Sequence, residues 1–203
     1  MIVYSIPSIP DRTRYILDNT QPNPLPEMLR IGNQLAQLGA DHIAIPCVTA
    51  HYFYEALESG VPVPIVNGVR ETVRLLNEQG LKTVGIMATD GTIRSGIFHR
   101  ELEKEGMTPV VPSPERQADV MHLIFENVKA GIPADMARFS AVSQQLRDAG
   151  AEAIILGCTE LSLIKRDNPI GPGFIDAMEV LAQRSVLHCG KPLKPEYRDL
   201  ISK

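Results

Sequence analysis

Two stretches of the chain share one pattern: GADHIAIPCVTAH runs from Gly39 to His51, and GAEAIILGCTEL runs from Gly150 to Leu161. In each stretch a glycine, an alanine and an acidic residue precede an apolar run, and a cysteine stands eight positions after the glycine. A glycine that ends a helix, followed by an apolar run without alternation, is typical of a buried strand in a parallel sheet. The pattern therefore predicts two similar βα units, one in each half of the chain.

Short β-branched runs alternate with longer helical patterns along the rest of the sequence, which predicts βα units on parallel sheets. We expect strands at residues 2–6, 42–45, 62–66, 83–87, 108–111 and 153–156, and helices at 27–38, after 47, up to 80, up to 105, on both sides of 131–133, and at 176–187. The predicted fold class is α/β with two pseudo-symmetric domains, each a small parallel sheet flanked by helices, and an active-site cleft between them. The first domain comprises residues 1–77 with the C-terminal helix of residues 171–203, and the second comprises residues 78–170.

The composition excludes several classes of protein. The 203 residues are 44% hydrophobic, which is enough for a packed core, and a net charge of −4 argues against binding to nucleic acid. No apolar run approaches the roughly 20 residues of a membrane span, and the first residues do not resemble a signal peptide. Three cysteines do not make a disulfide framework, so we expect a cytoplasmic protein with reduced thiols.

The two matched cysteines, Cys47 and Cys158, each follow a predicted strand and precede a predicted helix. Ligands of open α/β sheets bind outside the carboxyl ends of the strands, and a helix N-terminus lowers the pKa of a nearby thiol. Two facing domains would each place one sulfur at a shared cleft. One thiolate could then remove a proton from a carbon atom while the other thiol delivers a proton to the opposite face, which inverts the carbon.

Other roles for these cysteines stay open at this point. A cysteine is often a small apolar core residue, although core packing gives no reason for the repeated offset from a glycine. Cys47, His51 and Cys158 could hold zinc, although the CxxC spacing is absent. Cys47 with His51 could form a hydrolase pair, or the cysteines could form a regulatory disulfide. Cys189 has no counterpart in the repeat, and we interpret it as a bystander.

Two segments, IPCVTAHYF at 45–53 and LGCTELSL at 156–163, resemble the two signature segments of the aspartate/glutamate racemase family. Weaker likenesses, closest to the aspartate racemase branch, extend over nearly the whole chain: IPDRT at 9–13, GIMATDGTIRSGIF at 85–98, VKAG at 128–131 and FIDAMEVLA at 174–182. The resemblance implies a racemase of a small acidic amino acid that needs neither pyridoxal phosphate nor metal. It also implies two pseudo-symmetric α/β domains and a possible homodimer.

The resemblance also implies roles for individual residues. Cys47 and Cys158 match the two catalytic cysteines. Residues that match the binding positions for the substrate α-carboxylate are Thr49, Thr92 and Thr159. Arg12 and Lys129 match residues associated with the side-chain carboxylate, a role that suits them because cationic side chains bind carboxylates through charge-assisted hydrogen bonds.

The chain departs from the family pattern in two places. Val48 stands where the family has asparagine after the first cysteine, so one polar contact to the substrate is missing. Met1 falls at what resembles the family's second strand, without the preceding strand and Gly-rich loop, so we expect unpaired backbone and apolar surface in the first domain. One hypothesis is an N-terminally incomplete racemase, and the other is a sheet repaired by a partner chain. The alternative function is a catalytically inactive or impaired homologue that binds the ligand.

Overall fold

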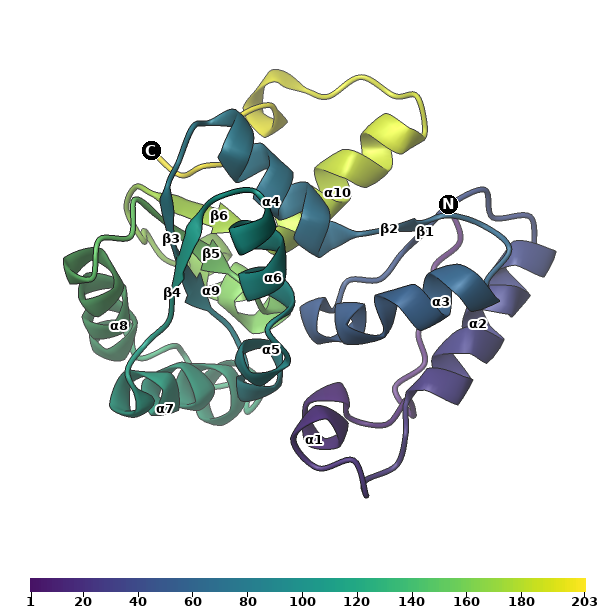
Figure 1. Cartoon of the computed structure of the whole chain (residues 1–203), viewed down its shortest axis with the longest axis horizontal. Coiled ribbons are helices and arrows are strands. Elements are labelled where there is room, and N and C mark those ends of the chain that lie inside the picture. Colours follow the sequence, from purple (N-terminus) through teal and green to yellow (C-terminus); the bar gives the residue numbers. More distant parts are fainter.

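The computed structural model describes residues 1–203 and contains two α/β halves of unequal size (Figure 1). The larger half is built on a four-stranded parallel sheet with the strand order β4-β3-β5-β6. Its strands are β3 (Thr83–Met87), β4 (Thr108–Val110), β5 (Ala153–Leu156) and β6 (Phe174–Asp176). In the central register Met87 lies opposite Leu156, and Leu156 lies opposite Asp176, so these strands end at the same edge of the sheet.

Helices cover both faces of this sheet. On one face are α4 (Gly68–Glu78), α6 (Ile97–Lys104) and α10 (Ala177–His188), and on the other are α7 (Pro114–His122), the π-helical η2 (Leu123–Val128), α8 (Met136–Asp148) and α9 (Thr159–Asp167). Successive residues of β5 pack on opposite faces: Ile155 belongs to the first apolar cluster, and Ile154 and Leu156 belong to the second. This two-sided burial explains why the strand sequence is apolar without alternation.

The smaller half has a two-stranded parallel sheet of β1 (Ile43–Ala44) and β2 (Ile65–Val66). Its helical elements are α1 (Arg12–Leu17), α2 (Leu25–Gln37), the 3₁₀ segment η1 (Val48–Phe53) and α3 (Tyr54–Gly60). Met28, Phe53 and Leu57 belong to a separate apolar cluster on this sheet. The predicted α/β class with two small parallel sheets flanked by helices is confirmed.

The repeated Gly-Ala pair has the same backbone structure in both halves. Gly39 follows α2 with φ of 85°, and Gly150 follows α8 with φ of 94°. In both places the N–H of the next residue bonds a carbonyl in the last turn of the helix, at N–O distances of 3.1 and 3.0 Å. This arrangement is the Schellman motif, which favours glycine because only glycine adopts positive φ without strain.

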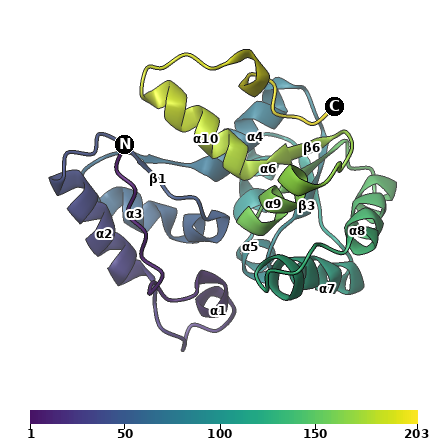
Figure 2. The same ribbon diagram turned by 180° about the vertical axis from the view of Figure 1, so that it is seen from behind.

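The predicted strand at residues 2–6 is wrong. The segment is extended but pairs with no strand, and it runs along the smaller half toward α1 (Figure 2). Ile2 and Val3 are 47% and 78% exposed. A β-branched segment becomes a strand only where a neighbour accepts and donates its ladder hydrogen bonds, and β1 is paired with β2 alone.

The helix predicted up to residue 105 is two helices. α5 (Asp90–Ser95) ends at Gly96, whose φ of 65° breaks the helix, and α6 begins directly afterwards. None of the helices of the structure has the length and apolar character needed to cross a membrane.

The C-terminal helix α10 packs on α4, which lies almost entirely within the first predicted domain, and also on the larger sheet. β6 pairs with β5, and Ala177 and Val180 of α10 belong to the core of the four-stranded sheet, as does Val69 of α4. α10 also reaches the smaller half, because the rings of His188 and His42 stack at a centroid distance of 5.3 Å. The chain then continues through the 3₁₀ turn η3 (Pro195–Tyr197). The domain limits at residues 77 and 170 stay a prediction.

Candidate active site

The first cysteine, Cys47, lies directly before η1 and is partly buried. Arg12, the first residue of α1, donates from Nη2 to the Cys47 sulfur at 3.6 Å. Its Nη1 donates to the carbonyl oxygens of Ile9 and Pro10 at 3.4 and 3.1 Å, which fixes the guanidinium in front of the sulfur. Two residues 35 positions apart in sequence are thereby joined, and the sulfur of Cys47 is a hydrogen-bond acceptor.

Four buried threonine hydroxyls connect the two halves. Thr49 of η1 lies 3.2 Å from Thr92 of α5 and 3.4 Å from Thr89, and Thr89 lies 3.2 Å from Thr92. Thr13 of α1 donates to Thr89 at 3.4 Å. Thr89 also caps α5 by accepting the N–H of Thr92. These hydroxyls can rotate to donate or accept, so they form a pre-assembled polar group at the junction.

Gly91 allows the halves to approach at this point. A Cβ atom built on Gly91 would lie 2.9 Å from the Cα of Thr13 and 3.1 Å from its Oγ1. Real Cβ atoms do not come this close to backbone atoms, so a larger residue would push α1 away from α5. Gly91 thus lets α1 pack closely against α5, next to Thr92.

The second cysteine, Cys158, ends the turn after β5 and precedes α9. Its thiol donates to Oε2 of Glu160 at 2.8 Å, and the Thr159 hydroxyl donates to the same oxygen at 2.9 Å. Nζ of Lys129, at the end of η2, lies 3.8 Å from Oε1 of Glu160. The carboxylate of Glu160 therefore gathers three of the predicted site residues, Cys158, Thr159 and Lys129.

Burial and the Glu160 carboxylate raise the pKa of Cys158 well above its ordinary value, and the charge of Cys47 raises it further. The sequence led us to expect a lowered thiol pKa at a helix N-terminus. The N–H of Glu160 does act in that direction, but desolvation of the thiolate and the nearby carboxylate outweigh it.

Both ring nitrogens of His51 bond backbone groups. Its Nδ1 bonds the carbonyl oxygens of Cys47 and Val48 at 3.1 and 3.2 Å, and its Nε2 accepts the N–H of Gly68 at 3.0 Å. Because Nε2 is an acceptor, the proton lies on Nδ1. Burial lowers the pKa of His51 and keeps the ring neutral. Both nitrogens are engaged with backbone groups, which argues against the zinc and hydrolase alternatives.

Val48, which replaces the family's asparagine, faces the core. Its side chain is 3% exposed and packs with Val69 and Val73 in the largest apolar cluster. The free thiol of Cys189 is exposed after α10, remote in sequence from the repeated cysteines.

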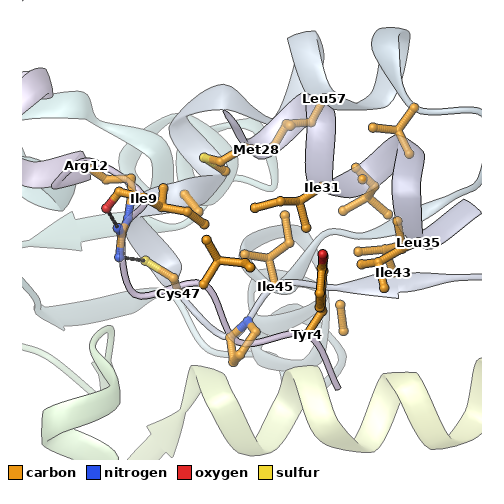
Figure 3. A pocket seen from close by; sticks show the side chains of 17 residues that line it. Tyr4, Ile9, Arg12, Met28, Ile31, Leu35, Ile43, Ile45, Cys47 and Leu57 are labelled. Carbon is orange, nitrogen blue, oxygen red and sulfur yellow. Dashed lines mark hydrogen bonds between the residues drawn. The ribbon is translucent and has the colours of Figure 1, made fainter. Parts of the chain in front are cut away.

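A cavity of about 190 Å³ adjoins Cys47 in the smaller half. Arg12 and Cys47 form one end of it, and Leu35 and Ile43 lie at the other (Figure 3). Fourteen of its seventeen lining residues are hydrophobic, including Ile43 and Ile45 beside β1. Among the lining residues only Arg12, beside Cys47, offers a charge for an acidic ligand.

The sequence-predicted residues fall into two groups in the structure. Arg12 with Cys47 forms one group, and Cys158, Thr159 and Lys129 form the other around Glu160. Thr49 and Thr92 meet at the junction of the halves. Sequence reasoning missed Glu160, Thr13 and Thr89. The sequence carried no signal for Glu160, because side chains two positions apart on a helix do not face each other, and only the extended backbone of Cys158 before α9 brings the sulfur to the carboxylate.

The fold and the matched cysteines define the class: an α/β protein with two similar halves, each of which places one cysteine at the start of a helical segment. A family model for Asp/Glu/Hydantoin racemases matches residues 1–184, and the chain belongs to this family. The family resemblance expected from the signature segments is confirmed.

Two curated relatives illustrate the likeness. The chain is 29% identical to the broad specificity amino-acid racemase RacX of Bacillus subtilis over 156 residues, which cover 75% of this chain and 66% of the relative. It is 30% identical to the glutamate racemase of Persephonella marina over 146 residues, which cover 68% of this chain and 52% of the relative. The aligned region thus spans less than two thirds of either relative.

Solved structures support the fold. The Picrophilus torridus aspartate racemase superposes with a TM-score of 0.82 and 29% identity over 97% of this chain and 82% of that chain. An aspartate racemase homologue from Pyrococcus horikoshii gives a TM-score of 0.74 with 23% identity, over 94% of this chain and 83% of that one, and shares the fold.

Proposed function

We propose that the protein racemises a small acidic amino acid, with aspartate as the first substrate to test, without a cofactor. The observation that carries the proposal is the contrast between the two cysteines. The Cys47 sulfur accepts a hydrogen bond from a guanidinium, whereas the Cys158 sulfur donates one to a carboxylate. A base and an acid are what a two-base inversion needs on opposite faces of one carbon.

In this mechanism the Cys47 thiolate removes the proton from the substrate Cα, and its sulfur becomes a thiol. The Cys158 thiol then gives its proton to the other face of the same carbon and becomes a thiolate. The product has the opposite configuration, and the number of protons on substrate and enzyme is unchanged. The reverse reaction uses the same two groups in exchanged roles.

The carbanion between the two steps requires stabilisation of the α-carboxylate. The hydroxyls of Thr49, Thr92 and Thr159 are the proposed donors, and on substrate binding the Thr159 hydroxyl turns from Glu160 to the α-carboxylate. The cationic groups of Arg12 and Lys129 are the proposed partners of the side-chain carboxylate. An amino acid without a side-chain carboxylate would lose these charge-assisted contacts, and the apolar lining beside Cys47 offers no charged group in their place.

Deuterium exchange separates this function from ligand binding alone. The protein is incubated with L-aspartate in heavy water, and the α-proton signal is followed by NMR together with the optical configuration. We expect exchange and inversion in the unaltered protein and the loss of inversion in both Cys47→Ser and Cys158→Ser. Aspartate binding without exchange in the unaltered protein would instead support an inactive ligand-binding homologue. Cys189→Ser serves as the matched control and is expected to keep full activity.

A further inference from the structure

The role of Glu160 is not explained by substrate binding or by the fold. It is the second residue of α9, and its side chain is 15% exposed. One oxygen, Oε2, accepts both the Cys158 thiol at 2.8 Å and the Thr159 hydroxyl at 2.9 Å. A carboxylate in this place can accept a proton donor, but it repels a negatively charged sulfur. The geometry is therefore compatible with a thiol at Cys158 and opposes a thiolate.

The other charged groups around Cys158 do not cancel this effect. Lys129 is 3.8 Å from the farther oxygen of Glu160, its side chain is 44% exposed, and its Nζ also lies 4.1 Å from the ring of Phe125. Because the lysine end of this pair is exposed and the distance is long, solvent screening weakens the attraction. Cys47, from the other half, adds a further negative influence. Asp176, at the end of β6, is occupied by hydrogen bonds from Ser162 and from the N–H of Met178.

The surroundings of Cys47 are the opposite. A guanidinium, held by two backbone carbonyls, donates to its sulfur. The chain thus presents a cation to one cysteine and an anion to the other. Burial already favours the thiol at Cys158, because Cys158 is buried and Cys47 is only partly buried, and the Glu160 carboxylate adds to this difference.

We propose that Glu160 is a positioning residue that holds Cys158 as a thiol in the resting enzyme, so that Cys47 is the base and Cys158 the acid of the first turnover. The inference rests on the proposed racemisation. After Cys158 has given up its proton, its thiolate lies beside a carboxylate and is the less stable of the two protonation states. The free enzyme then returns to the resting state by moving one proton from Cys47 to Cys158 through solvent.

The difference between the two cysteines should change the pH profile of kcat/KM, but it cannot change the ratio of kcat/KM for the two enantiomers. The equilibrium constant of a racemisation is one, so kcat/KM must remain equal for the two enantiomers whatever Glu160 does. The effect of Glu160 appears instead in the pH profile. The basic limb of kcat/KM reports loss of the proton from the acid, Cys158. Replacing Glu160 with a neutral residue of the same shape should move this limb to lower pH.

The decisive experiment measures the thiols directly and does not depend on activity. Cys189→Ser protein is treated with iodoacetamide at a fixed pH near neutrality, and alkylation of the Cys47 and Cys158 peptides is timed by mass spectrometry. In Glu160→Gln we expect Cys158 to react about tenfold faster, because the thiolate fraction rises once the carboxylate is gone. Cys47 should change by less than about twofold. Glu55→Gln, an exposed carboxylate on α3 without a side-chain partner, is the matched control and should alter neither rate.

Glu160→Asp distinguishes the effect of the negative charge from a disturbance of the structure caused by any substitution at this position. It retains the carboxylate and is expected to keep the slow alkylation of Cys158 and the position of the basic limb. An unchanged Cys158 alkylation rate in a folded Glu160→Gln protein overturns the proposal, and so does equal acceleration in Glu160→Gln and Glu160→Asp. Faster Cys158 alkylation in Glu160→Gln, together with no racemisation by the unaltered protein, supports the role of Glu160 and contradicts the proposed function instead.

Discussion

Replacing His51 with phenylalanine tests how the turn that carries Cys47 is held. Phenylalanine has a similar shape but no nitrogen, so the N–H of Gly68 loses its acceptor at a buried site. The carbonyl of Cys47 still accepts the N–H of Ala50, so most of the loss falls on Gly68. An unpaired buried N–H costs about 1–3 kcal/mol, and we expect the free energy of unfolding to fall by about 2 kcal/mol.

Urea unfolding followed by circular dichroism measures this loss. His122→Phe is the matched control, because His122 on α7 makes no side-chain hydrogen bond and should change stability little. We also expect less inversion activity in His51→Phe, because the Cys47 carbonyl loses its link to the imidazole. Equal urea midpoints for His51→Phe and the unaltered protein would refute the reasoning.

The pH dependence of stability gives a second test of the same histidine. Burial lowers the pKa of His51 below its ordinary 6.5, so the unfolded chain binds a proton more readily than the folded chain. Its contribution to stability is therefore complete above about pH 6.5 and is lost as the pH falls through the lowered folded value. The unaltered protein should lose stability on acidification more steeply than His51→Phe. His99, whose pKa burial also lowers, is common to both proteins and cancels in the comparison. Parallel stability curves would contradict the assignment.

Three further changes address the junction and the rim of the site. Gly91→Ala should lower the free energy of unfolding, measured with urea, by about 1–3 kcal/mol, because its Cβ would collide with Thr13; unchanged stability would mean that α1 moves aside at no cost. Thr89→Val should cost about 1 kcal/mol through the lost cap of α5, and inversion activity should fall with it; an unchanged NMR exchange rate would separate the threonine group from catalysis. Lys129→Met should raise KM for aspartate about fivefold with a smaller change in kcat, since an exposed cation contributes about 1 kcal/mol; an equal loss in kcat would assign it a different role.

The local pattern around each cysteine was predictable because it depends on near neighbours in sequence. The glycine at positive φ and the cysteine before a helical segment follow from short-range preferences, and the structure has them in both halves. The strand is fully buried only in the second half, because Ala44 of β1 is exposed. The strand at residues 2–6 could not be judged in the same way. Its composition favours a strand, but strand formation requires a hydrogen-bonding neighbour that only the whole fold can supply.

The sequence by itself determined the α/β class, the two matched cysteines and the family. Those features reside in spacing and in the periodicity of apolar residues, which a linear chain displays directly. Only the tertiary structure decided that Arg12 faces Cys47, that Thr49 meets Thr92, and that Glu160 accepts the Cys158 thiol. The physical reason is that the pKa of a thiol depends on its burial and on its distance from charged groups, and both are set by folding. Two cysteines with the same local sequence can therefore differ in protonation once folding places a cation beside one and a buried carboxylate beside the other.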